Sequence, residues 1–338
     1  MWRNNLDHFN NQAHAATEQE QPVLDIEELN VMGRKHKVCP FYYSRNALEH
    51  AELVLLPYNY LFDRAARDSL NICWKDAVVI FDEAHNLESF ASDASSFELT
   101  SVDIGGCVLE VQKAVGVLQQ GSSGFHAVDG DHHGSVNVDN LLKLKSMFLM
   151  LEEALDQAVP SGGSFSGDYI FQFFRMARLT YSNHDIFLKF VRQVSDLIME
   201  SRGGAAASAT PRLDNFASCL RKAFGGNTEA HCIAKTRAYR VYISPSNGTS
   251  NKQNNSSSNN KQQRMTGQAS NRKERTLSYW CFAPALAMIE LEGLGLRSII
   301  VTSGTLSPMK SYSLELGLKF DGTRDCDFVL CCYFIFTE

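Results

Sequence analysis

Several features are missing from this chain of 338 residues, and each absence excludes a class of protein. No apolar run approaches the roughly 20 residues that cross a membrane, and the longest candidate, residues 328–336, is far too short. The first residues are polar and carry no apolar segment of the kind found in secretory signals. We therefore expect neither a membrane protein nor a secreted one.

Cysteine pairs at metal-ligand spacing are also missing. The nine cysteines are scattered, no Cys-x-x-Cys pair occurs, and no cysteine precedes Cys39. Cys326, Cys331 and Cys332 lie close together but have no second ligand pair at zinc spacing, so plain thiols are the favoured interpretation. An odd number of cysteines without a secretory signal indicates reduced thiols in the cytosol or the nucleus.

Basic charge and a phosphate-binding loop are lacking as well. The net charge is −6, so any contact with DNA must come from local patches rather than from the charge of the whole chain. The sequence contains no Gly-Lys dipeptide, which excludes the P-loop motif Gly-x-x-x-x-Gly-Lys-Ser/Thr. A hydrophobic content of 44% and a charged content of 21% are otherwise typical of a globular protein, here long enough for two or three domains.

What is present is an apolar run that leads into two acids, over residues 77–86 (Ala-Val-Val-Ile-Phe-Asp-Glu-Ala-His-Asn). Its five apolar residues predict a parallel strand buried on both faces. Ligands of open α/β sheets bind just beyond the carboxyl ends of such strands, where Asp82 and Glu83 lie. A bare Asp-Glu pair would indicate a solvated turn, but the full tetrad favours Mg²⁺ at Asp82 and a water polarised by Glu83. His85 would report the nucleotide state to neighbouring loops.

The segments around this strand alternate as in a βαβ unit of a parallel sheet. Before it we expect a strand over 51–57, ended by Pro57, and a helix over 58–69. From residue 100 to about 238 the pattern is helical without strands, which predicts a separate helical domain. The helices expected there are 100–119, 139–158, 168–180, 184–200 and 212–224.

Strand character returns over 239–243 and 277–282, and we expect these two segments to pair. Residues 244–275 between them are rich in Ser, Asn and Gln, which predicts a disordered loop. Its basic side chains could follow a phosphate backbone, although a solvated linker is the favoured interpretation. A second fully buried strand over 297–302 ends in small hydroxyl residues, which again fits the ligand edge of a sheet.

Five stretches occur in one order: 39–45 (Cys-Pro-Phe-Tyr-Tyr-Ser-Arg), 57–61 (Pro-Tyr-Asn-Tyr-Leu), 82–85 (Asp-Glu-Ala-His), 277–282 (Leu-Ser-Tyr-Trp-Cys-Phe) and 302–308 (Thr-Ser-Gly-Thr-Leu-Ser-Pro). In this order they resemble the iron–sulfur superfamily 2 DNA helicases related to the XPD and FANCJ proteins. The tetrad resembles that superfamily's Walker B motif, the DEAH box.

The resemblance implies an α/β fold, with a partial RecA-like parallel-sheet motor domain and a helical Arch-type insertion. The implied order is a remnant of an iron–sulfur insertion (1–38), a motor segment with the DEAH box (39–99), the Arch (100–238), a return to the motor domain that contains the basic loop (239–320), and an atypical tail (321–338). ATP, Mg²⁺ and a [4Fe–4S] cluster are the implied cofactors. Single-stranded or forked DNA, ATP and DNA repair or replication proteins are the implied partners, in the nucleus.

The resemblance also implies roles for individual residues. Asp82 would hold Mg²⁺ through water and Glu83 would activate the hydrolytic water, with His85 beside them. Cys39 matches the fourth cysteine ligand of the cluster. The residues of the motif that couples ATP hydrolysis to DNA movement would be Ser303, Gly304 and Thr305. The residues near single-stranded DNA would be Tyr58, Asn59 and Tyr60, although aromatic anchoring of a core helix is an equal alternative.

The chain departs from the family pattern at three points. The P-loop lysine is missing, and one cysteine cannot hold a cluster that needs four ligands. The second motor domain, expected after Pro308, does not follow in these 338 residues. We therefore expect a segment of an ATP-dependent DNA helicase for repair, recombination and telomere maintenance that hydrolyses no ATP alone. The alternative is a catalytically inactive module that binds DNA or protein.

Overall fold

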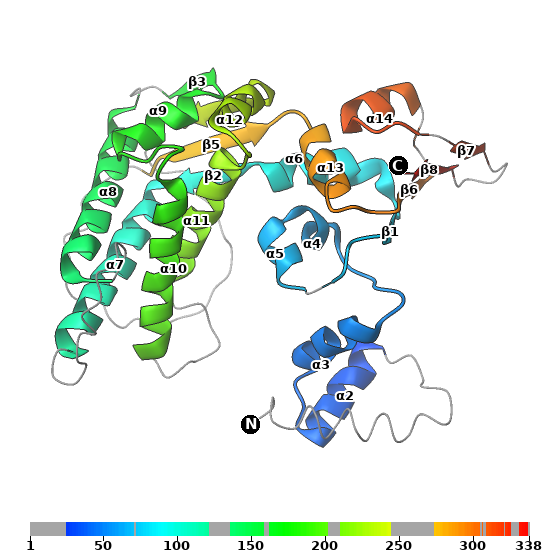
Figure 1. Cartoon of the computed structure of the whole chain (residues 1–338), viewed down its shortest axis with the longest axis horizontal. Coiled ribbons are helices and arrows are strands. Elements are labelled where there is room, and N and C mark those ends of the chain that lie inside the picture. The colour runs from blue at the N-terminus through cyan, green and yellow to red at the C-terminus, as the bar shows by residue number, and fades with distance from the viewer. Residues whose placement is uncertain are drawn as a thin grey trace, which may run out of the picture. The chain divides into compact units, whose positions relative to one another are not determined.

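The structure is a computed structural model of the chain (Figure 1). It describes residues 25–70, 72–121, 136–158, 162–201, 210–244, 274–304, 306, 309–320, 322–325 and 331–336. The chain divides into two compact units: unit 1 comprises Met1–Phe90, Ile289–Pro308 and Lys319–Glu338, and unit 2 comprises Ala91–Met288 and Met309–Leu318. Most of the predicted loop at 244–275 and the predicted site residue Thr305 lie outside the described residues.

The helices of unit 1 are short. They are α2 (Ile26–His36), α3 (Pro40–Ala47), the 3₁₀ helix η1 (Leu48–His50), α4 (Tyr58–Phe62) and α5 (Arg64–Asp68). Helix α2 begins with a capping box, in which Asp25 accepts from the backbone N–H of Glu28 and Glu28 accepts from that of Asp25. The single helix predicted over 58–69 is divided at Asp63, whose carboxylate instead accepts from the N–H of Ala66 and starts α5.

The strand predicted over 51–57 is wrong. These residues form neither helix nor strand, and the side chains of Leu53 and Leu55 are exposed. An apolar run becomes a strand only where a neighbouring strand can pair with it, and none of the described strands lies alongside this segment.

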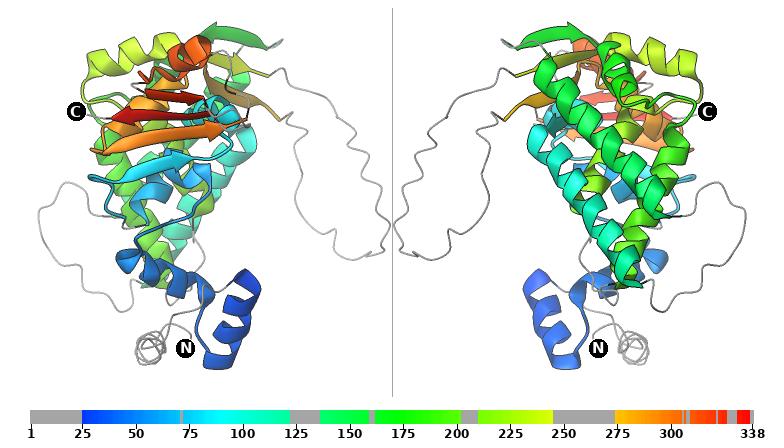
Figure 2. Two further views of the ribbon diagram at one scale, coloured as in Figure 1. Left: turned by 90° about the vertical axis from the view of Figure 1, so that its right-hand side faces the viewer. Right: turned by 90° about the vertical axis from the view of Figure 1, so that its left-hand side faces the viewer.

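The sheet of unit 1 contains β1 (Val78–Phe81), β6 (Ser298–Ser303), β7 (Gly322–Asp325) and β8 (Cys331–Phe336), in the order β1-β6-β8-β7 (Figure 2). Strands β1 and β6 are parallel, as predicted, with Val79 opposite Ile299. Burial of β1 on both faces is a wrong prediction: Val79 and Phe81 are buried, whereas Val78 and Ile80 are 49% and 59% exposed. Within the described sheet β1 is the edge strand, and only one of its faces is covered.

Most of the remaining elements belong to unit 2. They are β2 (Phe97–Thr100), α7 (Ser101–Gly121), α8 (Val138–Gln157), β3 (Gly163–Ser166), α9 (Tyr169–Met176), α10 (His184–Ser201), α11 (Pro211–Phe224), α12 (Glu229–Lys235), η3 (Thr236–Ala238), β4 (Tyr239–Ile243), β5 (Thr276–Cys281) and α14 (Met309–Leu316). The 3₁₀ helix η2 (Ala84–Asn86) belongs to unit 1, and the residues of α6 (Leu87–Ser95) and α13 (Ala285–Glu292) are divided between the two units. The five predicted helices of this block are confirmed as α7 to α11. No described helix has both the length and the apolar character needed to cross a bilayer.

Unit 2 also has a sheet of its own, which was not predicted. Its order is β2-β5-β4-β3, and all neighbours are antiparallel. The predicted pairing of β4 with β5 is confirmed, but these strands join β2 and β3 instead of returning to the sheet of β1. The strand that does return there is β6, which pairs with β1 in parallel.

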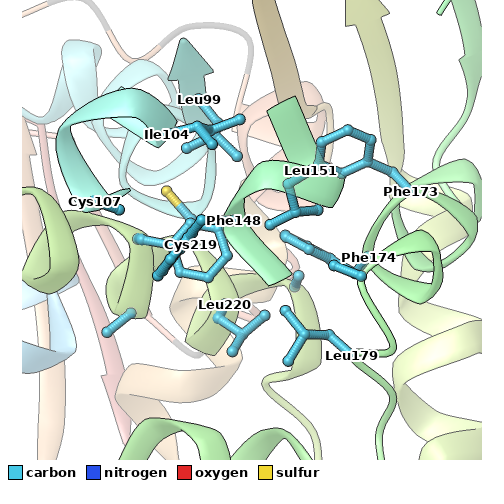
Figure 3. Close-up of a cluster of buried hydrophobic side chains, with 14 of the residues drawn as sticks. Leu99, Ile104, Cys107, Phe148, Leu151, Phe173, Phe174, Leu179, Cys219 and Leu220 are labelled. Atoms are coloured by element: carbon cyan, nitrogen blue, oxygen red, sulfur yellow. The ribbon is translucent and has the colours of Figure 1, made fainter. Parts of the chain in front are cut away.

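The core of unit 2 forms where the long helices pack together and against this sheet (Figures 1 and 3). The rings of Phe148 and Phe216 meet edge to face with centroids 4.9 Å apart, and Phe174 packs beside Phe216. Cys107 and Cys219 are buried in this core as free thiols, and burial raises the pKa of Cys219 to about 12. Such thiols stay protonated at neutral pH and serve packing.

Candidate functional site

The candidate site begins where β1 ends in the residues 82–85, here called the DEAH turn. Asp82 is exposed, and one of its carboxylate oxygens accepts from the backbone N–H of Glu83 at 3.0 Å. Glu83 adopts a left-handed backbone conformation, with φ 50° and ψ 45°. Few residues with a side chain adopt it, and they concentrate at functional sites. The side chain of Glu83 is 71% exposed, so both carboxylates are accessible.

His85 links this turn to the end of the neighbouring strand. Its Nδ1 lies 3.1 Å from Oε2 of Glu83 and 3.2 Å from Oγ of Ser303, the last residue of β6. Its Nε2 lies 2.9 Å from the side-chain amide nitrogen of Asn86, which can only donate. Nε2 is therefore the acceptor and Nδ1 carries the proton, which is shared between Glu83 and Ser303. The parallel pairing of β1 and β6 brings these groups to one sheet edge.

The residues next to Ser303 are placed less completely. Gly304 is exposed and follows the strand directly, while Thr305 lies outside the described residues. Thr302 is buried, and its Oγ1 has no hydrogen-bond partner among the described residues. Of the three predicted coupling residues, Ser303 is thus the one that the structure connects to the DEAH turn.

Tyr58 supports the DEAH turn from α4. Its hydroxyl donates to the backbone carbonyl of Asp82, and its ring meets Phe81 and Phe90 edge to face at 5.5 and 5.1 Å. Burial, followed by the charges of Asp82 and Glu83, raises the pKa of Tyr58. These contacts are those of an anchoring residue, the alternative that the sequence left open.

The other two predicted DNA-facing residues lie differently. Asn59 is exposed and Tyr60 is half-buried on the same short helix. Neither makes a contact that explains its residue type among the described residues, so their approach to DNA stays a prediction.

Sequence reasoning missed one residue of this region, Arg67. It is only 4% exposed; one terminal nitrogen donates to the carbonyl of Leu61 at 2.5 Å and the other to Glu290 at 2.7 Å. Arg67 therefore ties α4 and α5 to the segment that precedes β6. No local signal could have revealed this role, because Glu290 is 223 residues away along the chain.

The donor groups of the site suit Mg²⁺ but not the [4Fe–4S] cluster. The carboxylates of Asp82 and Glu83 are hard oxygen donors of the kind that Mg²⁺ takes together with water and phosphate. Cys39 is half-buried at the start of α3, and the described residues contain no group of three or more potential metal ligands. Since no cysteine precedes Cys39, the residues present do not fit a [4Fe–4S] cluster.

An α/β unit with a DEAH turn beside a hydroxyl-bearing strand end, followed by a helical unit, defines a helicase-type protein with a helical insertion. Two family models match the chain: "RTEL1 helicase, ARCH domain" over residues 106–284 and "DEAD_2" over residues 2–104. The first covers more than half of the chain, and the chain belongs to this RTEL1 helicase ARCH-domain family. The resemblance to XPD-related helicases, the α/β class and the Arch-type insertion are thereby confirmed.

Individual relatives agree with this assignment. The chain is 34% identical over 330 residues to "Regulator of telomere elongation helicase 1" of Homo sapiens, covering 92% of this chain and 26% of the relative. It is 36% identical over 309 residues to the homolog of Oryza sativa subsp. japonica, covering 88% and 28%. The chain thus spans about a quarter of the length of these relatives. A solved structure named "XPD_Helicase" aligns with a TM-score of 0.45 at 17% identity, covering 89% of this chain and 41% of that one.

Proposed function

We propose that the chain contributes the DEAH-box and Arch segment of an ATP-dependent DNA helicase of telomere maintenance, DNA repair and recombination in the nucleus. The observation that carries the proposal is the link from Glu83 through Nδ1 of His85 to Ser303, at 3.1 and 3.2 Å. This link joins the acids of a nucleotide site to the strand end that leads into the proposed coupling residues, Ser303, Gly304 and Thr305.

In this proposal Asp82 would hold Mg²⁺ through water, and the ion would supply positive charge for the phosphates of ATP. Glu83 accepts a proton from the attacking water. When Glu83 changes its charge or position, the shared proton of His85 turns toward or away from Ser303. The DEAH turn can in this way pass on the state of the nucleotide to β6 without any movement of the sheet.

Tyr58 and its neighbours extend the proposal to DNA. Tyr58 holds the carbonyl of Asp82, while Asn59 and Tyr60 on the same helix are the residues proposed to approach a single strand. One five-residue helix then has contacts to both the nucleotide site and the DNA path. DNA repair or replication proteins are further proposed partners.

The missing P-loop favours a second candidate for these 338 residues alone, a binding module without motor activity. Unit 2 has its own sheet and its own core, so it can present a surface without a working nucleotide site. Both candidates can hold for one sequence: the segment binds, and hydrolysis requires a P-loop that the segment does not carry.

The test is to purify the endogenous protein with an antibody against residues 100–238 and to measure its mass and its ATPase activity. We expect a mass above that of the 338 residues and ATP hydrolysis that single-stranded DNA stimulates. A protein of the size of the 338 residues without DNA-stimulated hydrolysis would contradict the helicase proposal and leave the binding module.

A further inference from the structure

The sheet of unit 2 has one face turned away from its helical core. The residues Tyr239, Val241, Leu277 and Tyr279 point into the core and are at most 1% exposed. The alternate positions of all four strands form the opposite face, here called the outer sheet face. Its residues are Glu98, Thr100, Ser164, Ser166, Arg240, Tyr242, Thr276, Ser278 and Trp280.

Two aromatic side chains dominate the outer sheet face. Tyr242 and Trp280 lie on the neighbouring strands β4 and β5 with their rings nearly parallel, at an angle of 11° and with centroids 5.5 Å apart. Parallel rings at that centroid distance are offset, so each ring leaves part of its own face uncovered. Trp280 is 40% exposed although it stands in the middle of a strand.

The remaining side chains of the face are polar, and all but Glu98 and Arg240 are small hydroxyl residues. The described strands carry no aliphatic side chain at their outward positions, and Ser278 beside the two rings is held by donating to Glu98 at 3.0 Å. A lipid surface would require aliphatic anchors around the aromatic ones. A flat aromatic pair within a surface rich in hydroxyl groups instead suits ligands whose rings are flat and carry polar atoms at their edges.

Charge on the side of β4 is positive. Arg240 stands directly opposite Trp280 in the strand register, and it is exposed, with one terminal nitrogen donating to the carbonyl of Tyr239 at 2.9 Å. Arg237 precedes the same strand, whereas the ammonium of Lys235 lies over the ring of Tyr239, which points into the core. The acids nearest along the strands are Glu98, which accepts from Ser278, Asp168, which accepts from Ser166, and Glu274, which precedes β5. A polyanion can therefore run along β4 while its bases reach the rings.

We propose that the outer sheet face binds unpaired bases of a single-stranded nucleic acid, which stack on Tyr242 and Trp280 while Arg240 contacts the phosphate backbone. Stacking on aromatic rings is largely independent of sequence, because every base has a flat face. Four-stranded sheets of RNA-recognition modules bind bases in this manner. The proposal rests on the proposed helicase function only in its choice of DNA as the first ligand to test.

The experiment measures binding of fluorescein-labelled oligothymidylate to the purified 338-residue chain by anisotropy. We expect Trp280→Ala and Tyr242→Ala each to weaken binding by roughly 5- to 100-fold. Trp280→Phe keeps a ring and should stay within about threefold of the unsubstituted chain. Leu109→Ala is the matched control, since Leu109 is an exposed apolar residue (61%) on α7 and lies on no strand. Its affinity should not change.

A salt titration separates stacking from charge. Arg240→Ala should make the slope of the logarithm of the binding constant against the logarithm of the salt concentration less steep, by about the amount expected for one phosphate contact. Trp280→Ala should lower the affinity and leave this slope unchanged. Oligouridylate distinguishes RNA from DNA as the ligand, and tighter binding of either supports the site. A blunt duplex should bind more weakly, because its bases are already stacked, and should not respond to Trp280→Ala.

Two results would overturn the proposal: no binding of either single strand, or binding that Trp280→Ala and Tyr242→Ala leave unchanged. Neither result decides the helicase proposal, which depends on the ATPase activity of the endogenous protein. Conversely, an endogenous protein without ATPase activity leaves the binding measurement intact.

Discussion

Tyr58 combines a polar and an apolar contact at the DEAH turn, and the two can be separated by substitution. Tyr58→Phe keeps the ring against Phe81 and Phe90 and removes the hydrogen bond to the carbonyl of Asp82. We expect the free energy of unfolding to fall by about 0.5–1.5 kcal/mol, measured by urea denaturation. Tyr60→Phe on the same helix is the control and should change it by less than about 0.5 kcal/mol. Equal effects of the two substitutions would contradict the anchoring role.

The same hydroxyl gives a prediction about pH. Burial and the nearby carboxylates of Asp82 and Glu83 raise the pKa of Tyr58 above its ordinary value of 10.0, so the folded state favours the protonated phenol. Its stabilising contribution is therefore complete below pH 10 and is lost as the pH rises through the higher folded pKa. The difference in unfolding free energy between the unsubstituted chain and Tyr58→Phe should be constant from about pH 7 to 9 and then decrease. A difference that grows above pH 10 would refute the assignment.

Residues of the site differ in how far the sequence could reveal them. Asp82, Glu83 and His85 were predictable, because an apolar strand followed by this tetrad is a local pattern. That His85 and Ser303 lie at the same edge of the sheet was predictable from two separate strand ends, since parallel strands share one carboxyl edge, but their contact was not predicted. Arg67 and the hydroxyl of Tyr58 were not predictable in these roles, because their partners are side chains or carbonyls remote in the sequence.

At the scale of elements, periodicity decided what could be foreseen. Helices α7 to α11 repeat apolar residues over several turns, so their positions were clear from the sequence. Strands β2 and β3 have four residues each, too few for an alternating pattern to stand out. The segment 51–57 looked like a strand from its apolar residues alone, yet pairing is a property of two segments. The prediction that β1 is buried on both faces was wrong for a similar reason, because burial depends on what covers each face of the strand.

Helix α11 shows how one element can complete another. Its N-cap residue Thr210 makes no side-chain cap. The carboxylate of Glu110, from α7, instead accepts from the backbone N–H groups of Arg212 at 3.1 Å and Leu213 at 2.9 Å. A buried carboxylate at a helix N-terminus satisfies donors that the helix leaves open and interacts well with its dipole.

Removing this carboxylate should weaken the packing of α11 on α7. We expect Glu110→Ala to lower the free energy of unfolding by about 1.5–3 kcal/mol, since one buried and one part-buried N–H group lose an ionised partner. Glu110→Gln keeps one acceptor and should cost less. Gln119→Ala, at an exposed position of the same helix, is the control and should change stability by less than about 0.5 kcal/mol. A loss in Glu110→Ala as small as in this control would show that Arg212 and Leu213 find other acceptors.

At the scale of the whole molecule, the chain combines the DEAH turn, which we propose to face a nucleotide, with the absence of a P-loop motif from its 338 residues. The acids of the DEAH turn are accessible, and His85 connects Glu83 to Ser303. The Gly-Lys pair that would cradle the phosphates occurs nowhere in the 338 residues. We therefore expect chemistry at this site to depend on a P-loop from outside these residues.

This dependence gives a direct prediction for the purified 338-residue chain: it should release no phosphate from ATP above background, with or without single-stranded DNA. Positioned acids alone do not replace a P-loop, because the γ-phosphate must first be held in line with the attacking water. The measurement is colorimetric phosphate release, with Glu83→Gln as the control for contaminating ATPases. DNA-stimulated release that Glu83→Gln abolishes would mean that other groups of this chain hold the phosphates. In that case the chain would be a hydrolase in its own right, and the basic residues around the sheet edge would be the first to substitute.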